Sequence, residues 1–563
     1  MKYSKLVEVY EALSSTTKRL EKTQILAHFL KQLDEKEKDV LYLLEGRIFP
    51  SHYEKNLGIN SQIAIKTLSQ STGISTSDIV RKWRSTGDLG ETAEELCKNK
   101  KQSTLFSKDL NVENIIENLR KLPEIEGKGA IDKKSQLIAE LFSRSSGKEA
   151  KYLMRTLLSD LRIGIKESTI RDALAEAFYP ENKKEAIEKI ASALETSNDI
   201  GEVFIRSKRG LKELDSTKLK VGTALKVMLA QKAKNIEEGF KTVGKPAAIE
   251  YKYDGFRLLI NKDEHSNVSM FTRRLENVTK QFPEVAEYVK KYVKGSSFII
   301  DSEVVGYDGK THEYLPFQSI SQRIKRKYDI EEVRAKFPIE LNVFDILYYE
   351  NKSLLKEPFK KRSQLLRKII KSEKWKIIPA KQIITDNEKE AEKFYKEALK
   401  NNQEGVMMKN LEAEYKPGSR VGYMLKIKPS ENDLDLVIVG AEYGTGKRGG
   451  WLSSFILACK HEGNFLEIGR VSTGLKEKEE QGVSFIELTN LLKPLITEDE
   501  GRIVKVQPKI VVSVTYQEIQ RSPSYSSGFA LRFPRFRALR PDRGLHDIAS
   551  LSEIKKEYDK QRE

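Results

Sequence analysis

The spacing of hydrophobic residues changes along this chain, and that change constrains the fold more than any other feature of the sequence. Up to about residue 205, apolar residues recur at helical intervals, as Leu153, Leu157 and Leu161 do. Ser168 or Thr169 is a candidate N-cap for the next helix, because a hydroxyl there can accept a hydrogen bond from an unpaired backbone N–H. The periodicity predicts an all-helical N-terminal part.

The pattern becomes strand-like from about Ala247 and changes again after Pro429. Between these points, buried strands interrupted by amphipathic helices predict a mixed α and β region. After Pro429, short strands separated by turns indicate a small β-barrel of the OB type. The polar and basic stretch 206–220 is expected to lead into a linker. The expected strands are 247–253, 256–260, 298–305, 340–348, 434–441, 455–459, 465–471 and 510–516, and the expected helices of the middle region are 360–371 and 388–399.

Length and composition limit the class of protein. A chain of 563 residues and 64.5 kDa exceeds one hydrophobic core, so about two to four domains are expected. No apolar run approaches the roughly 20 residues of a membrane-spanning helix, and residues 1–22 contain no apolar stretch of the kind that marks a secretory signal. Cys97 and Cys459 offer no disulfide framework and no thiolate metal site, so a reducing, intracellular compartment is expected.

The net charge favours a polyanionic partner. Lys and Arg number 100 against 83 Asp and Glu, which gives a formal charge of +17 and a pI near 9.3. Such an excess is typical of nucleic-acid binding, because basic side chains release counterions from phosphates. A Lys- and Glu-rich solvated surface, common in thermophiles, is the alternative. Charge alone does not decide between them.

Two other patterns point to no chemistry. The glycine-rich stretch 444–450 lacks the first glycine and the Ser or Thr of a Walker A loop, so we interpret it as a basic hairpin turn. The histidines show no metal-ligand spacing, so a zinc site is not expected. They are His28, His52, His265, His312, His461 and His546. Chemistry is therefore expected to depend on lysine, carboxylate and arginine side chains.

The segment from Glu250 to Arg257, EYKYDGFR, is the most informative in the chain. On a strand, Glu250, Lys252 and Asp254 point to one face, and Gly255 then allows a sharp turn. A free lysine, with a pKa of about 10.4, is almost wholly protonated at neutral pH and cannot attack. Nearby cations and partial desolvation favour the neutral amine, whereas Glu250 and Asp254 oppose it. The segment alone fits a structural ion pair or an activated amine.

A series of charged and aromatic segments follows in order downstream of Lys252. Each alone is compatible with core packing or a salt bridge, but we do not expect the whole series to arise by coincidence. A carboxylate in an apolar strand is costly unless it is paired, and lysines two positions apart on a strand share a face. The segments are Phe271-Thr272-Arg273-Arg274, Ile300-Asp301-Ser302-Glu303-Val304-Val305, Phe344-Asp345-Ile346-Leu347, Glu404-Gly405-Val406-Met407-Met408-Lys409, and Arg420 with Met424-Leu425-Lys426-Ile427-Lys428.

With this series the chain resembles the ATP-dependent DNA ligases of the archaeal and eukaryotic replicative type. Segment 531–543, with its arginines, resembles the last motif of that family, and a plain DNA-binding strip is the alternative. Residues 161–165 and 169–174 resemble the helical DNA-binding domain of the same subgroup. The resemblance covers essentially the whole chain. It implies an all-helical DNA-binding domain at 1–215, an α+β nucleotidyltransferase (adenylation) domain at 216–428, and an OB-fold β-barrel at 429–563.

The resemblance also implies a role for each site residue. Lys252 would attack the α-phosphorus of ATP and form a lysyl-AMP. AMP would then pass to a DNA 5′-phosphate, and a 3′-hydroxyl would displace it to seal a nick during replication, repair and recombination. The remaining roles are binding of the adenine amino group by Glu250, stacking on the base by Phe344, ribose and phosphate binding by Arg257 and Arg273, ribose and metal contact by Glu303, divalent-cation binding by Glu404, and neutralisation of phosphate charge by Arg420, Lys426 and Lys428.

The implied ligands and partners are ATP, Mg²⁺ or Mn²⁺, and nicked duplex DNA, and the implied state is a cytoplasmic, nucleoid-associated monomer without membrane contact. Gln102, Leu105 and Phe106 resemble peptides that insert into a sliding clamp, with an ordinary buried Leu–Phe pair as the alternative. Closure around DNA implies hinges near 206–222 and 428–434. Arg543 stands where the family usually has lysine, which puts the detail of pyrophosphate positioning in doubt.

Two rival functions deserve comparison. An RNA ligase or a GTP-using capping enzyme would share the lysine chemistry, but the N-terminal helical part argues against both. A non-catalytic DNA-binding or clamp-adaptor protein could keep the fold, but the intact Lys252, Glu303, Glu404 and Lys426 argue against loss of activity. Stacking on Phe344 and one carboxylate do not establish strict use of ATP.

Overall fold

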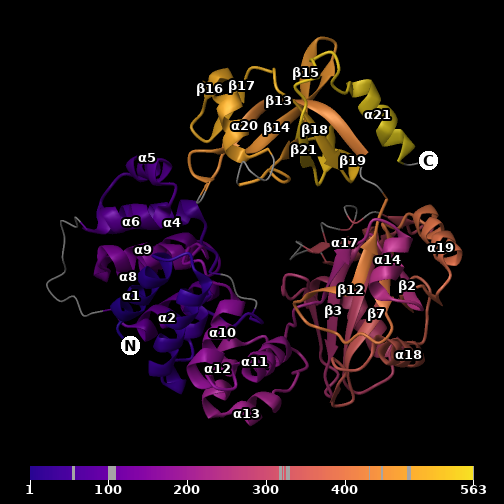
Figure 1. The fold of residues 1–563 in the computed structure, drawn as a ribbon, viewed down its shortest axis with the longest axis horizontal. Helices are drawn as coiled ribbons and strands as arrows, with labels where there is room; N and C mark the ends of the chain where they lie inside the picture. The colour runs from indigo at the N-terminus through magenta and orange to yellow at the C-terminus, as the bar shows by residue number, and fades with distance from the viewer. Residues whose placement is uncertain are drawn as a thin grey trace. The chain divides into compact units, whose positions relative to one another are not determined.

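The computed structural model describes residues 1–53, 57–98, 110–315, 317, 320, 323–324, 330–429, 432–445, 448–477 and 483–561. The chain forms two compact units, one made of residues 1–67 and 101–429 and the other of residues 68–100 and 430–563 (Figure 1). The clamp-like residues Gln102, Leu105 and Phe106 lie outside the described residues.

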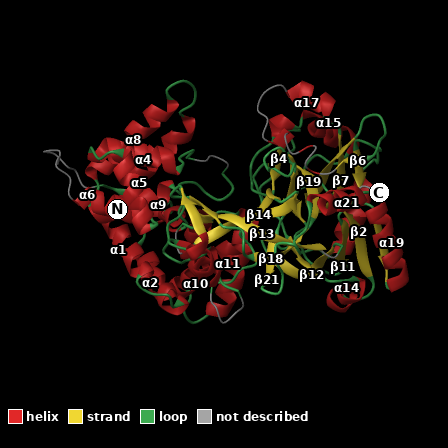
Figure 2. Ribbon diagram, turned by 90° about the horizontal axis from the view of Figure 1, so that it is seen from above, coloured by secondary structure: helices red, strands yellow, loops and turns green. Residues whose placement is uncertain are grey.

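The regular structure of the described residues up to Asp215 is helical, as the periodicity predicts (Figure 2). Helix α1, for example, buries Leu6, Tyr10 and Leu13, which lie three to four residues apart on one face. The helices are α1 (Tyr3–Ser14), α2 (Arg19–Gln32), α3 (Val40–Leu44), α4 (Ser61–Thr72), α5 (Thr76–Thr86), α6 (Leu89–Lys98), α7 (Val112–Lys121), α8 (Ala130–Arg144), α9 (Gly147–Leu157), α10 (Glu167–Phe178), α11 (Lys183–Ser197), α12 (Ile200–Arg209) and α13 (Leu211–Asp215).

Two local expectations in this part were wrong. Helix α9 ends at Leu157, so Leu161 is buried in the following loop and not in the helix. Helix α10 begins at Glu167, which places Thr169 inside its first turn, where Thr169 Oγ1 accepts a hydrogen bond from the Lys166 N–H at 3.4 Å. The helical part also continues beyond residue 205, because α12 and α13 extend it as far as Asp215.

Two sheets form the middle region and confirm its mixed α and β character. The first has the strand order β1-β12-β11-β2-β10, and the second runs β4-β3-β5-β7-β8, with β6 and β9 at its sides. The strands are β1 (Leu229–Lys232), β2 (Ala247–Lys252), β3 (Phe256–Lys262), β4 (Val268–Thr272), β5 (Phe298–Tyr307), β6 (Tyr314–Leu315), β7 (Ile339–Tyr349), β8 (Lys352–Ser353), β9 (Ile377–Pro379), β10 (Gln382–Thr385), β11 (Gly405–Asn410) and β12 (Arg420–Ile427). The helices are α14 (Ile236–Val243), α15 (Pro283–Tyr292), α17 (Ile330–Lys336), α18 (Phe359–Ile369) and α19 (Glu388–Lys400).

Apolar side chains join the two sheets. Leu259, Ile299 and Leu347 of the second sheet share a buried cluster with Val421 and Met424 of the first. A separate cluster lies under α14 and α19, where Phe240 and Phe394 pack with strands of the first sheet. Because each sheet is buried on both sides over much of its length, the strands are rigid supports for the polar residues at their ends.

The C-terminal part is rich in β-structure, as expected. Its longest strand, β13 (Asn432–Tyr443), pairs along one edge with β14 (Leu452–His461), and along the other edge with β17 (Ile503–Val506) and β18 (Val511–Tyr516). The sheet extends through β15 (Asn464–Val471), β16 (Ile496–Asp499) and β21 (Arg535–Leu539), and a separate hairpin is formed by β19 (Glu518–Arg521) and β20 (Phe529–Arg532). Helix α20 (Phe485–Leu492) follows β15, and α21 (Leu551–Lys560) is the last helix described.

Candidate active site

Backbone pairing brings Lys252 and Glu404 together. Lys252 is the last residue of β2 and pairs in register with Gly405 of β11, and the Glu404 N–H donates to the Lys252 carbonyl at 2.9 Å. Gly405 has φ +134°, and a Cβ there would lie 2.1 Å from the Ile427 carbonyl oxygen of β12. Only glycine therefore fits at this point, where β11 starts between its two neighbours.

Lys252, Glu404 and Lys428 form an ionic cluster. Lys252 Nζ lies 2.5 Å from Glu404 Oε2, and Lys428 is paired with the same oxygen. Burial opposes ionisation of Glu404, but the ammonium groups of Lys252 and Lys428 outweigh it and hold the pKa of that carboxyl well below its usual range. Asp254 lies past the end of β2, and its Oδ2 accepts from the Phe317 N–H at 3.3 Å. The carboxylate against the lysine is thus Glu404, and not Glu250 or Asp254 as expected.

Lys426 adds a further cation to this cluster. It lies on β12, and burial, followed by repulsion from Lys428, Lys252 and Arg420, lowers the pKa of Lys426. The cations outnumber the single negative charge of Glu404 and repel one another. The arrangement is therefore suited to a polyphosphate, whose negative charge would relieve the repulsion.

Glu303 lies close to the same lysine. It is on β5, opposite Arg257 of β3, and burial raises the pKa of the Glu303 carboxyl to about 8, an effect that Lys252 and Arg257 only partly offset. A divalent cation would add positive charge beside this partly buried carboxyl, so Glu303 and Glu404 fit a magnesium-type site of oxygen ligands. The described residues contain no group of three or more His, Cys, Asp or Glu side chains able to hold a metal. Further ligands would therefore come from water or phosphate.

Glu250, two residues before Lys252 on β2, and Phe344 of β7 share Lys409 of β11, for which we predicted no role. The Glu250 side chain is buried, and its Oε2 lies 2.6 Å from Lys409 Nζ of β11. Gln382 Nε2 donates to Glu250 Oε1 at 2.8 Å. Lys409 Nζ is also 4.9 Å from the centre of the Phe344 ring. The two residues expected to bind adenine thus share one neighbour.

Arg257 is held firmly by its surroundings. Its Nε and Nη2 donate to the two carboxylate oxygens of buried Asp301 at 2.9 and 2.5 Å, and its Nη1 donates to the Met228 carbonyl at 2.7 Å. Nη2 also donates to Tyr415 Oη at 3.2 Å, and the guanidinium lies 5.3 Å from the Phe344 ring centre. These contacts use most of the donors of Arg257, so its scope for direct contact with ribose or phosphate is small.

The other predicted arginines are more accessible. Arg273 follows β4 and is exposed, and Arg420, at the start of β12, is exposed and donates from Nη1 to the Ala230 carbonyl at 3.1 Å. In the C-terminal motif, Arg535 and Arg537 are exposed on β21, whereas Arg540 pairs with Asp435 at 3.0 Å. The exposed arginines of both regions, Arg273 and Arg420 in the middle region and Arg535 and Arg537 on β21, are accessible to anions.

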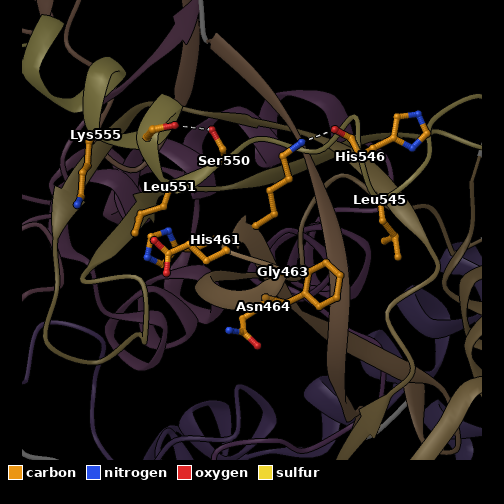
Figure 3. Close-up of a pocket in the computed structure, with 12 residues that line it drawn as sticks. His461, Gly463, Asn464, Leu545, His546, Ser550, Leu551 and Lys555 are labelled. Carbon is orange, nitrogen blue, oxygen red and sulfur yellow. Dashed lines mark hydrogen bonds between the residues drawn. The ribbon is translucent and has the colours of Figure 1, made fainter.

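A cavity of about 520 Å³ lies in the second compact unit, between residues 460 and 555 (Figure 3). Its walls combine the β14–β15 turn with the first turn of α21, and include His461, Leu545, His546 and Lys555. Lys460, which also lines it, donates to the His546 carbonyl. None of the predicted catalytic residues lines this cavity, so it is separate from the lysine cluster.

Across the described ranges, every helix is too short or too polar to cross a lipid bilayer.

Four residues of the site were given no individual role from the sequence, although Asp301 and Lys409 belong to segments singled out there. Asp301 precedes Glu303 by two positions on β5, so strand alternation alone would have placed both on one face. Lys409 and Gln382 face Glu250 because β11 and β10 pair with β2, a relationship that requires the sheet order. Tyr415 lies between β11 and β12, outside any regular element, and had no sequence signal.

Comparison with known proteins finds family models and relatives that match most of the chain. A family model for an ATP dependent DNA ligase domain matches residues 227–428, one for the DNA ligase N terminus matches residues 2–175, and one for the ATP dependent DNA ligase C terminal region matches residues 448–543. A curated protein named DNA ligase from Nanoarchaeum equitans is 47% identical over 567 residues, covering 100% of this chain and 99% of that protein. Another from Thermococcus onnurineus is 40% identical over 564 residues, covering 99% and 98%. A solved structure titled Pmar-Lig_Pre has TM-score 0.57 at 18% identity, over 95% of this chain and 99% of that one, a likeness of fold alone.

Proposed function

The chain belongs to the ATP-dependent DNA ligases, and from this premise we propose that Lys252 is the residue that becomes covalently adenylated. The observation that supports this assignment is the position of Lys252 Nζ, which lies 2.5 Å from Glu404, with Lys428 paired to the same carboxylate. A nucleophilic amine needs neighbours that can hold phosphate oxygens and a divalent cation around it, and this cluster supplies both.

The proposed reaction has three successive steps. The neutral Lys252 amine attacks the α-phosphorus of ATP, a P–N bond forms, the bond to pyrophosphate breaks, and the amine releases one proton. An oxygen of a DNA 5′-phosphate then attacks the adenylate phosphorus, a P–O bond forms, the P–N bond breaks, and the Lys252 amine leaves with a proton. Finally a 3′-hydroxyl attacks that phosphate, loses its proton, and displaces AMP to close the nick. Each step needs in-line positioning and compensation of charge on phosphate oxygens.

The other residues would serve the same transfers. Lys426, Lys428 and Arg420 would compensate phosphate charge, and Arg273 would meet the phosphates from the end of β4. Arg257 would support the ribose side of the nucleotide, because Asp301 and Tyr415 fix it against Phe344. Phe344 would stack on the base, and Glu250 would accept a hydrogen bond from the adenine amino group.

A divalent cation completes the proposal. Glu303 and Glu404 would hold Mg²⁺, or Mn²⁺, which would supply positive charge to the reacting phosphate. Before Glu404 can turn to a cation, it must release Lys252 and Lys428, so binding of the cation and exposure of the amine would be linked. Glu303, whose carboxyl has its pKa raised to about 8 by burial, would gain most from such a neighbour.

We extend the proposal to organisation and partners. The three domains would span 1–215, 216–428 and 429–563, with an OB-type barrel as the last. The enzyme would act as a cytoplasmic, nucleoid-associated monomer on nicked duplex DNA, and Gln102, Leu105 and Phe106 would contact a sliding clamp. Support comes from the basic charge of +17 and from exposed arginines such as Arg535 and Arg537.

The test is transfer of label from α-³²P-ATP in the presence of Mg²⁺. Wild type should acquire a covalent label that chases into joined DNA, and peptide mapping should place it on Lys252. Lys252→Ala should acquire none, whereas Lys352→Ala, which removes an exposed lysine paired with Glu357, should label like wild type. A labelled peptide elsewhere, or DNA joining by Lys252→Ala, would overturn the assignment.

A further inference from the structure

Lys409 lies between the two residues proposed to bind the adenine base. Its Nζ is 2.6 Å from Glu250 Oε2, and it donates to the Phe344 carbonyl at 3.4 Å. The same ammonium is 4.9 Å from the centre of the Phe344 ring and 4.5 Å from that of Phe359. The Lys409 side chain is only 6% exposed, so its charge is directed to these partners and not to solvent.

Gln382 binds the other oxygen of the same carboxylate. Its Nε2 donates to Glu250 Oε1 at 2.8 Å, while its Oε1 accepts from Ser363 Oγ at 3.3 Å. Because the Glu250 carboxylate can only accept, the Nε2 end of the amide faces it, and the Ser363 hydroxyl donates to the Oε1 end. The backbones of Gln382 and Glu250 are also paired between β10 and β2. Each oxygen of Glu250 therefore faces a donor that the fold holds in place.

We propose that Lys409 and Gln382 are positioning residues that hold Glu250 as an acceptor-only carboxylate, and thereby make the base site selective for purines with a 6-amino group. Both oxygens of Glu250 accept from the protein, and each retains a lone pair for the ligand. A 6-amino group can donate to that lone pair. A 6-oxo group, as in guanine, would instead set one acceptor against another in a buried site.

The inference rests on the proposed role of Glu250 and extends it to residues that need not touch the nucleotide. Lys409 also contacts the carbonyl and ring of Phe344, so one ammonium fixes the hydrogen-bonding group relative to the stacking surface. A buried ion pair is poor evidence of a stabilising role, because an apolar side chain of similar volume often packs as well. Selectivity offers a better reason for a buried charge here.

The experiment compares two enzymes with two nucleotides. Adenylation of Lys252 is measured by single-turnover labelling with ATP and with purine riboside triphosphate, which lacks only the 6-amino group. Lys409→Met should lower kcat/KM for ATP by about tenfold or more, since a charge-assisted contact is misplaced. With purine riboside triphosphate the loss should be less than about threefold, because the contact is already absent. The change should fall mainly on KM, and GTP should gain relative to ATP.

A matched control separates selectivity from general damage. Lys262→Met removes another buried lysine of the same region, whose Nζ donates to the Gly295 carbonyl and lies 5.4 Å from the Phe298 ring centre. It should affect both nucleotides equally. Gln382→Met should reproduce the Lys409→Met pattern with a smaller change, and Lys409→Arg should restore most of the preference for ATP. These two variants also decide the matter if Lys409→Met does not fold.

Equal losses with both nucleotides in Lys409→Met and Gln382→Met would overturn the inference, since the two residues would then serve the fold alone. Failure of the proposed function has a different signature: wild type would show no label on Lys252 with any nucleotide.

Discussion

Lys252 and Glu404 are held together twice, by an ion pair of 2.5 Å between their side chains and by a hydrogen bond of 2.9 Å between their backbones. An ammonium bound by a carboxylate cannot attack phosphorus, so the side-chain contact must be exchanged before reaction, while the backbone contact keeps the two residues adjacent. The pairing thus keeps Lys252, the proposed nucleophile, next to Glu404, the residue proposed to bind the divalent cation.

Glu404→Gln should weaken the binding of Mg²⁺ that adenylation of Lys252 requires. The amide keeps the size of the side chain but loses the charge that attracts a cation, so the Mg²⁺ concentration for half-maximal adenylation should rise on the order of tenfold or more. Glu397→Gln, which alters an exposed carboxylate paired with Lys381, is the control. An unchanged Mg²⁺ titration in Glu404→Gln would contradict a role in metal binding.

Asp301→Asn should be among the most destabilising conservative changes in the chain. Asp301 is 0% exposed and takes two hydrogen bonds from Arg257 and one from Tyr415. Loss of its charge leaves a buried guanidinium without a counterion, at a cost of about 3–5 kcal/mol. Urea denaturation measures this, with Asp132→Asn, which removes an exposed ion pair to Lys66, expected to change stability by about 1 kcal/mol or less.

Gly405→Ala should impair both stability and adenylation. At φ +134° an alanine is strained, and its Cβ would meet the Ile427 carbonyl at 2.1 Å, so β11 would have to move away from β12. We expect a loss of about 3 kcal/mol or more and little labelling of Lys252. Gly73→Ala also changes a glycine of positive φ, but in open space, and should cost only about 1 kcal/mol and leave labelling intact. Similar effects at both sites would argue against crowding as the cause.

Glu45→Gln should change how stability depends on pH. Burial, reinforced by Glu167, raises the pKa of Glu45 from 4.5 to about 7, and its Oε2 is buried without a hydrogen-bond partner. The folded chain therefore binds this proton more tightly than the unfolded chain, so the wild type loses stability as pH rises from about 4.5 through 7. The variant should have a higher Tm than wild type at pH 8 and a smaller advantage at pH 5. Glu117→Gln, at an exposed site, should show the same difference at both values.

The sequence could predict most elements of the middle region because their patterns are local. The charged residues Lys252 and Glu303 interrupt apolar strands, and the helices expected at 360–371 and 388–399 are α18 and α19 within one or two residues at each end. The ends of the helical region were less predictable. Leu161 continues a helical spacing, but α9 stops at Leu157, because burial of an apolar residue in a loop produces the same spacing.

Partnerships across the sheets could not be predicted from one sequence. We expected Glu250 to act on Lys252 because strand alternation puts both side chains on one face of β2. Alternation predicts the face of a side chain correctly, but it does not show which side chains of neighbouring strands contact it. Lys409 of β11 contacts Glu250, and Glu404, the residue before β11, contacts Lys252. Both contacts exist because β11 pairs with β2, a strand far from it in the sequence. The site roles assigned to Phe344 and Arg273 stay predictions until labelling tests them.

Strand β11 has no free edge: β2 is bonded along one side and β12 along the other. A single slip of its register would turn every outward group inward and separate Glu404 from its lysines at once. Nucleotide entry, pyrophosphate exit and delivery of a DNA end therefore cannot be timed by rearranging these strands. If the proposed site is correct, its strands form a rigid platform, and any slow motion that limits turnover would have to come from other parts of the chain.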